Sequence, residues 1–284
     1  MKPLILPGKH AGLSREQYDA IDAVNQSSLK ALVRQSPMHY RHALEHPEAP
    51  SAAMELGTAV HLACYEPARF AESVVAAPDV DRRTKAGREA YEAFQAEAAG
   101  KIILAADDHD RVTAMQQAVL AHPAARRAVG LAGDREVTLV WDDAETGVRC
   151  KGRLDHLSAN ATVVLDLKTT RNAHPAAFSA DIDKLNYHVQ AAFYVDGVVA
   201  TLGGEPPSFV FVVVESEAPH AVAVYELGAA SIELGRIKYR EALSVYAECR
   251  RTGRWPGYAD FITEIEVPAW ALARAGLSSR PIEE

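Results

Sequence analysis

Three charged residues lie among the apolar residues of the segment GRLDHLSANATVVLDLKTT (152–170): Asp155, Asp166 and Lys168. A buried carboxylate or ammonium group is costly unless it is paired, hydrogen-bonded or bound to a metal. Two carboxylates that share a polar face also repel each other unless a cation lies between them. Aspartate oxygens suit Mg²⁺ or Mn²⁺, which leave positions for phosphate oxygens. A lysine beside them can orient or help deprotonate an attacking water, so these residue types indicate metal-assisted phosphodiester hydrolysis.

A β-hairpin is the element that would bring the three charges together. If LSANAT forms the turn, strand alternation places Val164, Asp166 and Lys168 on one face of the second strand. A turn centred on the middle of LSANAT puts Asp155 opposite Val164 and diagonal to Asp166, within reach of a shared ligand. A slip of one residue would move Asp155 to the other face, so the register is a prediction. The spacing Asp-x-Lys is also typical of an exposed ion pair on a half-buried strand.

Hydrophobic periodicity divides the chain into a helical first half and a β-rich middle. Helices are predicted over 25–46, with a break near Pro37, and over 51–66, 85–99 and 107–121. Strands are predicted over 135–143, 147–158, 161–170, 208–216 and 221–227. A helix within 183–204 stops at Gly203, and a last helix covers 229–251. Strands, a helix and further strands predict a mixed β-sheet flanked by helices, an α/β (α+β) fold.

Length and composition favour one elaborated domain over 1–284. Its parts are a mainly helical N-terminal part (1–130), a sheet core (131–230) and a C-terminal helix and tail (231–284). Hydrophobic content of 48% and charged content of 24% are typical of a globular protein. No apolar run reaches the roughly 20 residues of a membrane helix, and the N-terminal apolar patch is too short for a signal peptide. We therefore expect a cytoplasmic protein without a membrane partner.

Cysteine count and net charge exclude several further classes. Three widely spaced cysteines favour neither a disulfide framework, nor a CxxC zinc site, nor an iron–sulfur cluster. The formal net charge of −8 excludes a uniformly basic surface that coats nucleic acid. A local basic groove stays open, because Lys and Arg cluster at 81–88, 126–127, 148–153 and 249–254. Each cluster is also typical of a solvated face or a salt-bridged helix end.

Four other residues could support such chemistry. Gln190 and Tyr194 lie at i and i+4 of a predicted helix and therefore share a face, although their apolar neighbours are typical of ordinary helix packing. His61 lies inside an apolar helix, a pattern more typical of a hydrogen-bonded core histidine. Glu136 begins a strand just before the hairpin and is a candidate supporting acid.

Five stretches together resemble the PD-(D/E)xK nuclease superfamily. Within it, the sequence is most similar to the RecE-type exonuclease VIII branch, which is related to RecB nuclease domains and phage lambda exonuclease. The stretches are VNQSSLKALVRQSPMHY, ELGTAVHLACYEP, CKGRLDHLS, VVLDLKTT and YHVQAAFYVDG, in the family's order over most of 24–200. Leu154 stands where the motif has proline, and Asp166 stands where many members have Glu. The resemblance implies a restriction-endonuclease-like core.

The resemblance also implies roles for individual residues. The implied metal ligands are three side chains and one backbone carbonyl, namely those of His61, Asp155, Asp166 and Leu167. The implied catalytic side chains are the two acids with the motif lysine and the QxxxY pair, namely Asp155, Asp166, Lys168, Gln190 and Tyr194. Gln190 and Tyr194 would position the lysine or the scissile phosphate. The implied cofactor is Mg²⁺, with Mn²⁺ as a substitute.

Members of this branch degrade linear double-stranded DNA from its 5′ ends and leave 3′ single strands for recombination. The resemblance implies the same activity here, with a ring-shaped homo-oligomer, a RecT-type single-strand annealing partner and a bacterial, phage or prophage origin. A helix N-terminus could hold the end phosphate, and Ser27, Ser28 and Lys30 fit it, although N-capping explains the serines equally well. Arg153 is a further candidate for binding DNA.

Two other functions are compatible with this sequence. One is a structure- or sequence-specific endonuclease of the same fold, which closed circular DNA would distinguish from an enzyme that needs ends. The other is a catalytically silent DNA-binding module. The complete set of acids, lysine, histidine, glutamine and tyrosine argues against the silent module, because such a module has no chemical need for all of them.

Overall fold

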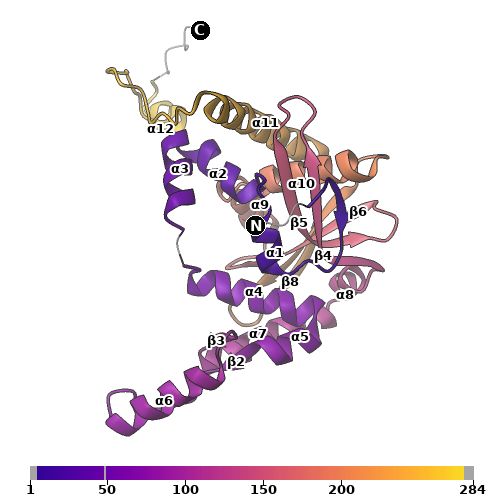
Figure 1. The fold of residues 1–284 in the computed structure, drawn as a ribbon, viewed down its shortest axis with the longest axis vertical. Coiled ribbons are helices and arrows are strands. Elements are labelled where there is room, and N and C mark those ends of the chain that lie inside the picture. Colours follow the sequence, from indigo (N-terminus) through magenta and orange to yellow (C-terminus); the bar gives the residue numbers. More distant parts are fainter. Residues whose placement is uncertain (1–4, 48, 278–284) are drawn as a thin grey trace.

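The computed structural model describes residues 5–47 and 49–277. At its centre lies a six-stranded sheet in the order β1-β4-β5-β6-β7-β8 (Figure 1). Its strands are β1 (Gly8–His10), β4 (Gly133–Asp142), β5 (Arg149–Ser158), β6 (Val163–Thr170), β7 (Ser208–Glu215) and β8 (Val222–Glu226). β6 and β7 are parallel, and the other neighbouring pairs are antiparallel. The predicted mixed sheet is confirmed.

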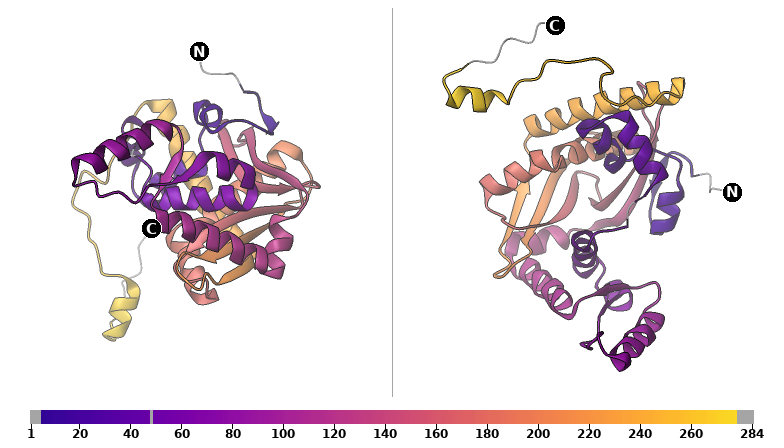
Figure 2. Two further views of the ribbon diagram at one scale, coloured as in Figure 1. Left: turned by 90° about the horizontal axis from the view of Figure 1, so that it is seen from below. Right: turned by 90° about the vertical axis from the view of Figure 1, so that its left-hand side faces the viewer.

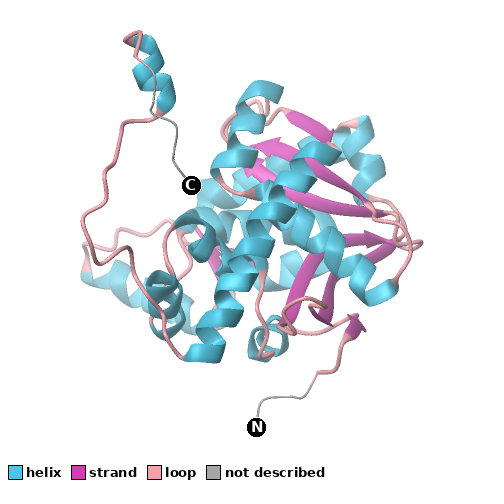
Figure 3. Cartoon of the chain, turned by 90° about the horizontal axis from the view of Figure 1, so that it is seen from above, coloured by secondary structure: helices cyan, strands magenta, loops and turns pink. Residues whose placement is uncertain are grey.

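Helices cover both faces of this sheet (Figure 3). The first layer holds α2 (Gln26–Arg34), α3 (Pro37–Glu45), α9 (Pro175–Lys184), α10 (Tyr187–Leu202) and α11 (Ala229–Thr252). The second layer holds α4 (Ala52–Tyr65), α5 (Pro67–Ser73), α7 (Ala106–Ala121) and α8 (Pro123–Val129). In β7, Phe209, Phe211 and Val213 pack into the first layer, whereas Val212 and Val214 pack into the second. Burial on both faces explains the unbroken apolar run of this strand.

The short helix α1 (Arg15–Ala20) is fixed to the sheet by a buried lysine. Tyr18 of α1 packs with Val140 of β4 in a small separate core. Lys151 of β5 is 4% exposed, and its Nζ donates to the carbonyls of Tyr18 at 2.8 Å and Ile21 at 2.9 Å. A cation at the carbonyl end of a helix is favourable because those carbonyls lack helical partners. This contact sets the position of α1 beside the middle of the sheet.

The close packing of α10 against α11 depends on Gly235. Asn186 precedes α10 with a φ of 54°, a left-handed conformation that asparagine tolerates, and α10 then begins at Tyr187. A Cβ built on Gly235 of α11 would lie 2.0 Å from the carbonyl oxygen of His188. Only a residue without a side chain therefore lets the two backbones approach this closely.

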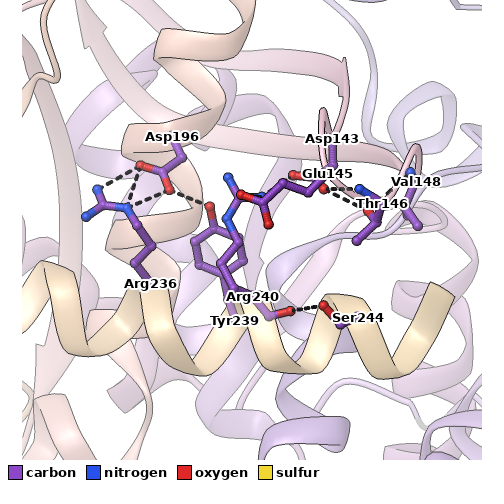
Figure 4. Close-up of polar contacts among 9 residues, drawn as sticks. All are labelled: Asp143, Glu145, Thr146, Val148, Asp196, Arg236, Tyr239, Arg240 and Ser244. Carbon is purple, nitrogen blue, oxygen red and sulfur yellow. Dashed lines mark hydrogen bonds and ion pairs between the residues drawn. The ribbon is translucent and has the colours of Figure 1, made fainter. Parts of the chain in front are cut away.

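A polar network ties α11 to α10 and to the β4–β5 connection (Figure 4). Arg236 of α11 pairs with Asp196 of α10 at 2.8 Å, and the hydroxyl of Tyr239 donates to the same carboxylate. Arg240 pairs with Asp143, which also accepts a hydrogen bond from the backbone N–H of Thr146 at 2.9 Å. These contacts hold the helix layer in one position over the sheet.

The β5–β6 hairpin forms as predicted, but its register differs from the prediction. Leu157 pairs with Val164, so the prediction that Asp155 faces Val164 is wrong. The loop is longer than a tight turn, because the Ser158 hydroxyl accepts hydrogen bonds from the backbone N–H of Thr162 at 3.1 Å and of Val163 at 3.0 Å. The resulting shift is two residues, which keeps Asp155 on the side of the predicted site.

An arm and a tail extend from the two ends of the molecule (Figures 1 and 2). The arm leaves the body at β2 (Val74–Ala76), carries α6 (Lys85–Glu97) and returns at β3 (Ile102–Leu104), which pairs with β2 in parallel. The tail follows α11 and carries α12 (Ala269–Arg274). Its start is anchored where Trp255 stacks on Tyr40 with ring centroids 5.4 Å apart.

The predicted helices and strands agree with the structure except for short elements. The break near Pro37 separates α2 from α3, and α10 ends at Leu202 with the predicted Gly203 as its C-cap. The prediction did not include β1, α1, α5, α8, α9, α12 or the β2–β3 pair, most of which are too short for a clear hydrophobic period. No helix within residues 5–47 and 49–277 has the length and apolar character needed to cross a membrane.

Replacing Gly235 by alanine is expected to lower the free energy of unfolding by about 2 kcal/mol, because the new methyl group meets the His188 carbonyl. Urea denaturation measures this change. Gly57 of α4 is the matched control, since a Cβ there has open space and the same substitution in a helix is expected to stabilise by about 0.5–1 kcal/mol. Equal effects of both substitutions would contradict the proposed helix contact.

Candidate functional site

A cleft of about 500 Å³ opens where β5 and β6 separate. In the described chain these two strands form only two residue pairs, His156 with Leu165 and Leu157 with Val164. Beyond them the strands diverge, and side chains from α1, α2, α4, β4 and α10 line the opening. Asp155 and Lys168 line this cleft from the two diverging strands.

Asp155 reaches across the opening to the backbone of β6. Its Oδ2 accepts a hydrogen bond from the N–H of Leu167 at 2.9 Å. His61, from α4, lies beside the same carboxylate with Nδ1 3.2 Å from Oδ2. The Nε2 atom of His61 lies 2.8 Å from the carbonyl oxygen of Leu167. Helix α4 thus supplies a side chain that bridges the two separating strands.

Glu136 belongs to the same group of potential ligands. One ligand atom each of His61, Glu136 and Asp155 lies within 4.8 Å of the others. In the β4–β5 register, Arg135 pairs with His156 and Val137 with Leu154, which places Glu136 level with Asp155. Glu136 has a φ of 49°, which is uncommon for a residue with a side chain and is typical of functional sites.

Asp166 lies deeper than the other acids and is 1% exposed. Its Oδ2 is 2.5 Å from Nζ of Lys168, and its Oδ1 accepts a hydrogen bond from Nε2 of Gln190 at 2.5 Å. A charge buried this completely is tolerated because both oxygens have a partner. The predicted Gln190 therefore contacts the acid directly.

Tyr187 links the site lysine to a second lysine. The Nζ of Lys168 lies 4.8 Å from the centre of the Tyr187 ring, and that of Lys30 lies 5.7 Å from it. Both distances fall within the range of cation–π contacts. Tyr187 is the first residue of α10, so the left-handed Asn186 before it sets the position of the ring.

Tyr194 lines the cleft through a close contact with β5. A Cβ on Gly152 would lie 3.1 Å from two carbons of the Tyr194 ring, so the absence of a side chain at Gly152 makes room for the ring. Gln190 and Tyr194 share the face of α10 that meets the site, as the spacing predicted.

Of the residues predicted to bind an end phosphate or DNA, Ser27 and Arg153 line the cleft. The hydroxyl of Ser28 donates to the carbonyl of Asn25 at 2.8 Å in the capping box of α2. Arg153 also pairs with Glu136 at 2.7 Å. Lys30 contacts the ring of Tyr187, and Tyr187 lines the cleft.

The electrostatics of the site favour a bound cation. Burial raises the pKa of Asp155 to about 7, and the charges of Asp166 and Glu136 act in the same direction against those of His61 and Lys168. Burial by itself lowers the pKa of Lys168, but Asp166 and Asp155 outweigh it, so this pKa is raised above its usual value. Burial and the charge of Lys168 lower the pKa of Lys30 to about 8.

The donor set fits a divalent metal ion. Both ring nitrogens of His61 face acceptors, the Asp155 carboxylate and the Leu167 carbonyl, yet a neutral imidazole has only one N–H. Lone-pair atoms therefore outnumber N–H groups where the carboxylates of Glu136 and Asp155, the Leu167 carbonyl and the His61 ring meet. Carboxylate and carbonyl oxygens with one imidazole form a set that suits Mg²⁺ or Mn²⁺.

Sequence reasoning missed several residues of this cleft. Tyr187 had no assigned role, although an aromatic residue three positions before Gln190 is a signal that could have drawn attention to it. Arg15, Tyr18 and Gln26 line the cleft from α1 and α2, and only the tertiary structure brings them there. Glu136 was expected to be a supporting acid and lies within the ligand group itself.

A family model described as a PDDEXK-like domain of unknown function (DUF3799) matches residues 25–266. The chain therefore belongs to this family, and its fold is of the PD-(D/E)xK nuclease type. The matched range includes every side chain of the ligand group and of the buried Asp166 contacts.

Among solved structures, the chain is similar to a protein from Eubacterium rectale that is provisionally named as an exonuclease. The TM-score is 0.58 at 11% identity, over 93% of this chain and 98% of that one, a likeness of fold. An alkaline exonuclease from Laribacter hongkongensis matches with a TM-score of 0.27 at 18% identity, over 60% of this chain and 86% of that one. No curated protein sequence matches the chain.

The affinity of the cleft for Mn²⁺ is expected to fall as the pH drops from 8 to 6. Because the pKa of Asp155 is raised to about 7, a proton competes with the metal below that pH, and the loss is up to about tenfold per unit. Isothermal titration calorimetry measures it. Asp155→Asn is expected to abolish the pH-dependent binding, whereas Asp183→Asn, at an exposed position of α9, leaves it unchanged. Equal wild-type affinity at both pH values would contradict this account.

Proposed function

We propose that this chain is a divalent-metal-dependent deoxyribonuclease that hydrolyses phosphodiester bonds from the ends of linear double-stranded DNA. The observation that carries the proposal is the group of His61, Glu136 and Asp155 beside the buried Asp166–Lys168 pair, at the point where β5 and β6 separate. A cluster of acceptors next to a lysine is the arrangement that phosphodiester hydrolysis needs.

The metal would be Mg²⁺, with Mn²⁺ as a substitute. Its ligands would be His61, Asp155, Asp166 and the carbonyl of Leu167. Glu136 lies close enough to His61 and Asp155 to be a further ligand. Such an ion supplies Lewis-acid polarisation of the scissile phosphate and a nucleophilic water at neutral pH. Binding there would also offset the burial and the carboxylate repulsion that raise the pKa of Asp155.

Lys168 acts in this proposal as a fixed positive charge. Its raised pKa keeps it protonated at neutral pH, so it orients the attacking water and stabilises the negative charge that develops on the phosphate. Gln190 holds Asp166 in place, and Tyr194 forms the wall of the cleft on the α10 side. The lysine is therefore an electrostatic group more than a general base.

We further propose 5′-to-3′ polarity, 5′-phosphate products and 3′ single strands that serve recombination. The support is the resemblance to RecE-type exonucleases, together with Ser27 and Arg153 in the cleft and Lys30 behind Tyr187, which form a polar side where an end phosphate can bind. A ring-shaped homo-oligomer, a RecT-type annealing partner and a bacterial or phage-encoded origin belong to the same proposal.

Wild-type protein with Mg²⁺ is expected to release label from 5′-labelled linear duplex DNA, and Asp166→Asn or Lys168→Ala to lower the rate about 100-fold or more. Asp183 and Lys238 form a matched pair outside the cleft, 3.3 Å apart, and Asp183→Asn or Lys238→Ala is expected to leave the rate unchanged. Absence of cleavage by the wild type with Mg²⁺ and with Mn²⁺ would refute the proposed function.

Closed circular duplex and linear duplexes with 5′-phosphate, 5′-hydroxyl or blocked ends distinguish an exonuclease from an endonuclease. The circular DNA is expected to stay intact while the open-ended linear forms are degraded. Strand-specific labels read the polarity in the same reactions. Cleavage of the circular DNA at the linear rate would favour an endonuclease instead.

Tyr187 is expected to act as a positioning residue for Lys168. Tyr187→Leu removes a cation–π contact of about 1 kcal/mol, so kcat is expected to fall about fivefold with little change in KM. Tyr187→Phe keeps the aromatic face and is expected to stay within about twofold of the wild type. If the phenylalanine and leucine variants lose the same activity, the ring does not position the lysine.

A further inference from the structure

The arm of residues 77–101 leaves and re-enters the body at one place. β2 and β3 lie side by side, with Val74 opposite Ile102, and Val74 and Leu104 belong to the core of the second helix layer. The chain between the two strands therefore projects outward, and α6 lies beyond α4 at one end of the molecule (Figures 1 and 2).

The polar and ring contacts of residues 81–101 lie within this segment. Arg82 covers the Tyr91 ring at 4.1 Å, Tyr91 contacts Phe94, and Thr84 accepts a hydrogen bond from the N–H of Gly87 at 3.0 Å. Within the described chain, none of the hydrogen bonds, ion pairs or ring contacts of this segment reaches the body. The arm therefore has its own local structure and an open surface.

The tip of this arm, residues 81–88, is basic and exposed. It carries Arg82, Arg83, Lys85 and Arg88 against one acid, Asp81, so its net charge is +3 in a chain whose net charge is −8. All five charged residues are exposed. The side chains of Arg83 and Lys85 are 92% and 84% exposed, and their contacts with acids are confined to the arm itself.

The charge order along α6 is the reverse of the one that stabilises a helix. There is no acid in its first turn and no base in its last turn, while the cations gather at its start and Glu89, Glu92 and Glu97 follow. Helix stability favours acids at the start and bases at the end. Helix stability therefore does not explain the cations at the tip, whereas an anionic partner would.

We propose that the basic arm tip binds the phosphate backbone of duplex DNA outside the catalytic cleft. This inference rests on the proposed function and adds a second contact to it. Duplex DNA carries one negative charge per roughly 1.7 Å of helix axis, so its phosphates complement the charge of a compact group of cations. Such contacts are independent of DNA sequence and hold the duplex in place.

The position of the arm relative to the cleft supports this partner. Helix α4 lines the cleft through Met54, Thr58 and His61, and the chain then runs through α5 into β2 and the arm. Figure 1 shows α4 between α6 and the helices α2 and α3. The 13 residues of α6 span about 20 Å at roughly 1.5 Å per residue, a length comparable with about half a turn of duplex. A duplex that enters the cleft can therefore be held at a second point by the arm.

The test is equilibrium binding of a fluorescent blunt 40-base-pair duplex, with Ca²⁺ present and Asp166→Asn as the background to prevent cleavage. The arm variant combines Arg83→Gln, Lys85→Gln and Arg88→Gln, and it keeps Arg82 because that side chain packs on Tyr91. Weaker binding is expected, with a slope of log affinity against log salt that is smaller by about 2 to 3. Circular dichroism checks that the variant is folded.

The matched control removes the same number of charges from a basic cluster at the end of α11, with Arg250→Gln, Arg251→Gln and Arg254→Gln. All three residues are exposed, and the control is expected to leave the salt slope unchanged. Equal loss in the arm and control variants would mean that only net charge matters, which overturns the inference. Unchanged binding by the arm variant would overturn it as well.

A second copy of the chain is the competing partner for the arm tip. Sedimentation velocity without DNA tests it, because loss of self-association in the arm variant with unchanged DNA affinity would replace our proposal. The inference and the proposed function fail separately. Arm-dependent binding without cleavage by the wild type refutes only the nuclease, whereas cleavage with arm-independent binding refutes only the arm contact.

Discussion

The buried carboxylate of Asp166 is the constraint on which the arrangement of this molecule depends. At 1% exposure it needs a partner for each oxygen, and Lys168 and Gln190 supply them. Gln190 reaches Asp166 because α10 packs on the sheet over β4 and β5, and α11 covers α10 from the other side. The closeness of α11 in turn depends on Gly235, which meets the backbone of His188. A polar requirement at the centre thus sets the packing of two helices.

The separation of β5 from β6 turns this buried pair into an accessible site. A continuous ladder would consume the backbone groups of Leu167, but the opening leaves its N–H to Asp155 and its carbonyl to His61. Helix α4 fills the opening from the other layer, so histidine and carboxylates converge from opposite faces of the sheet. The backbone of Glu136, at the same opening, is left-handed. The fold therefore departs from ordinary backbone preferences at its candidate site.

Rigid and projecting parts have different physical roles here. The sheet and its two helix layers are buried, paired and closely packed, and these properties hold catalytic groups in position. The arm and the tail bury little and end in exposed charged or apolar side chains, which suits contacts with other molecules. A site on the rigid part with contact surfaces on the projecting parts suits the deoxyribonuclease proposed above, whose substrate would be a long polymer.

The sequence by itself determined the mixed sheet and the main helices, because hydrophobic periodicity is a local property of the chain. Motif spacing and the family resemblance also predicted the residues that the structure brings together: His61, Asp155 and Lys168 line the cleft, and Gln190 contacts the buried Asp166. Tertiary structure alone decided the hairpin register, the entry of Glu136 into the ligand group, and the ring of Tyr187 between two lysines. Each of these depends on loop geometry or on contacts between distant segments. Hydrogen bonds to the Ser158 hydroxyl stabilise a four-residue loop in place of a tight turn, and the loop length sets the register. The hydrophobic pattern contains no information about these hydrogen bonds.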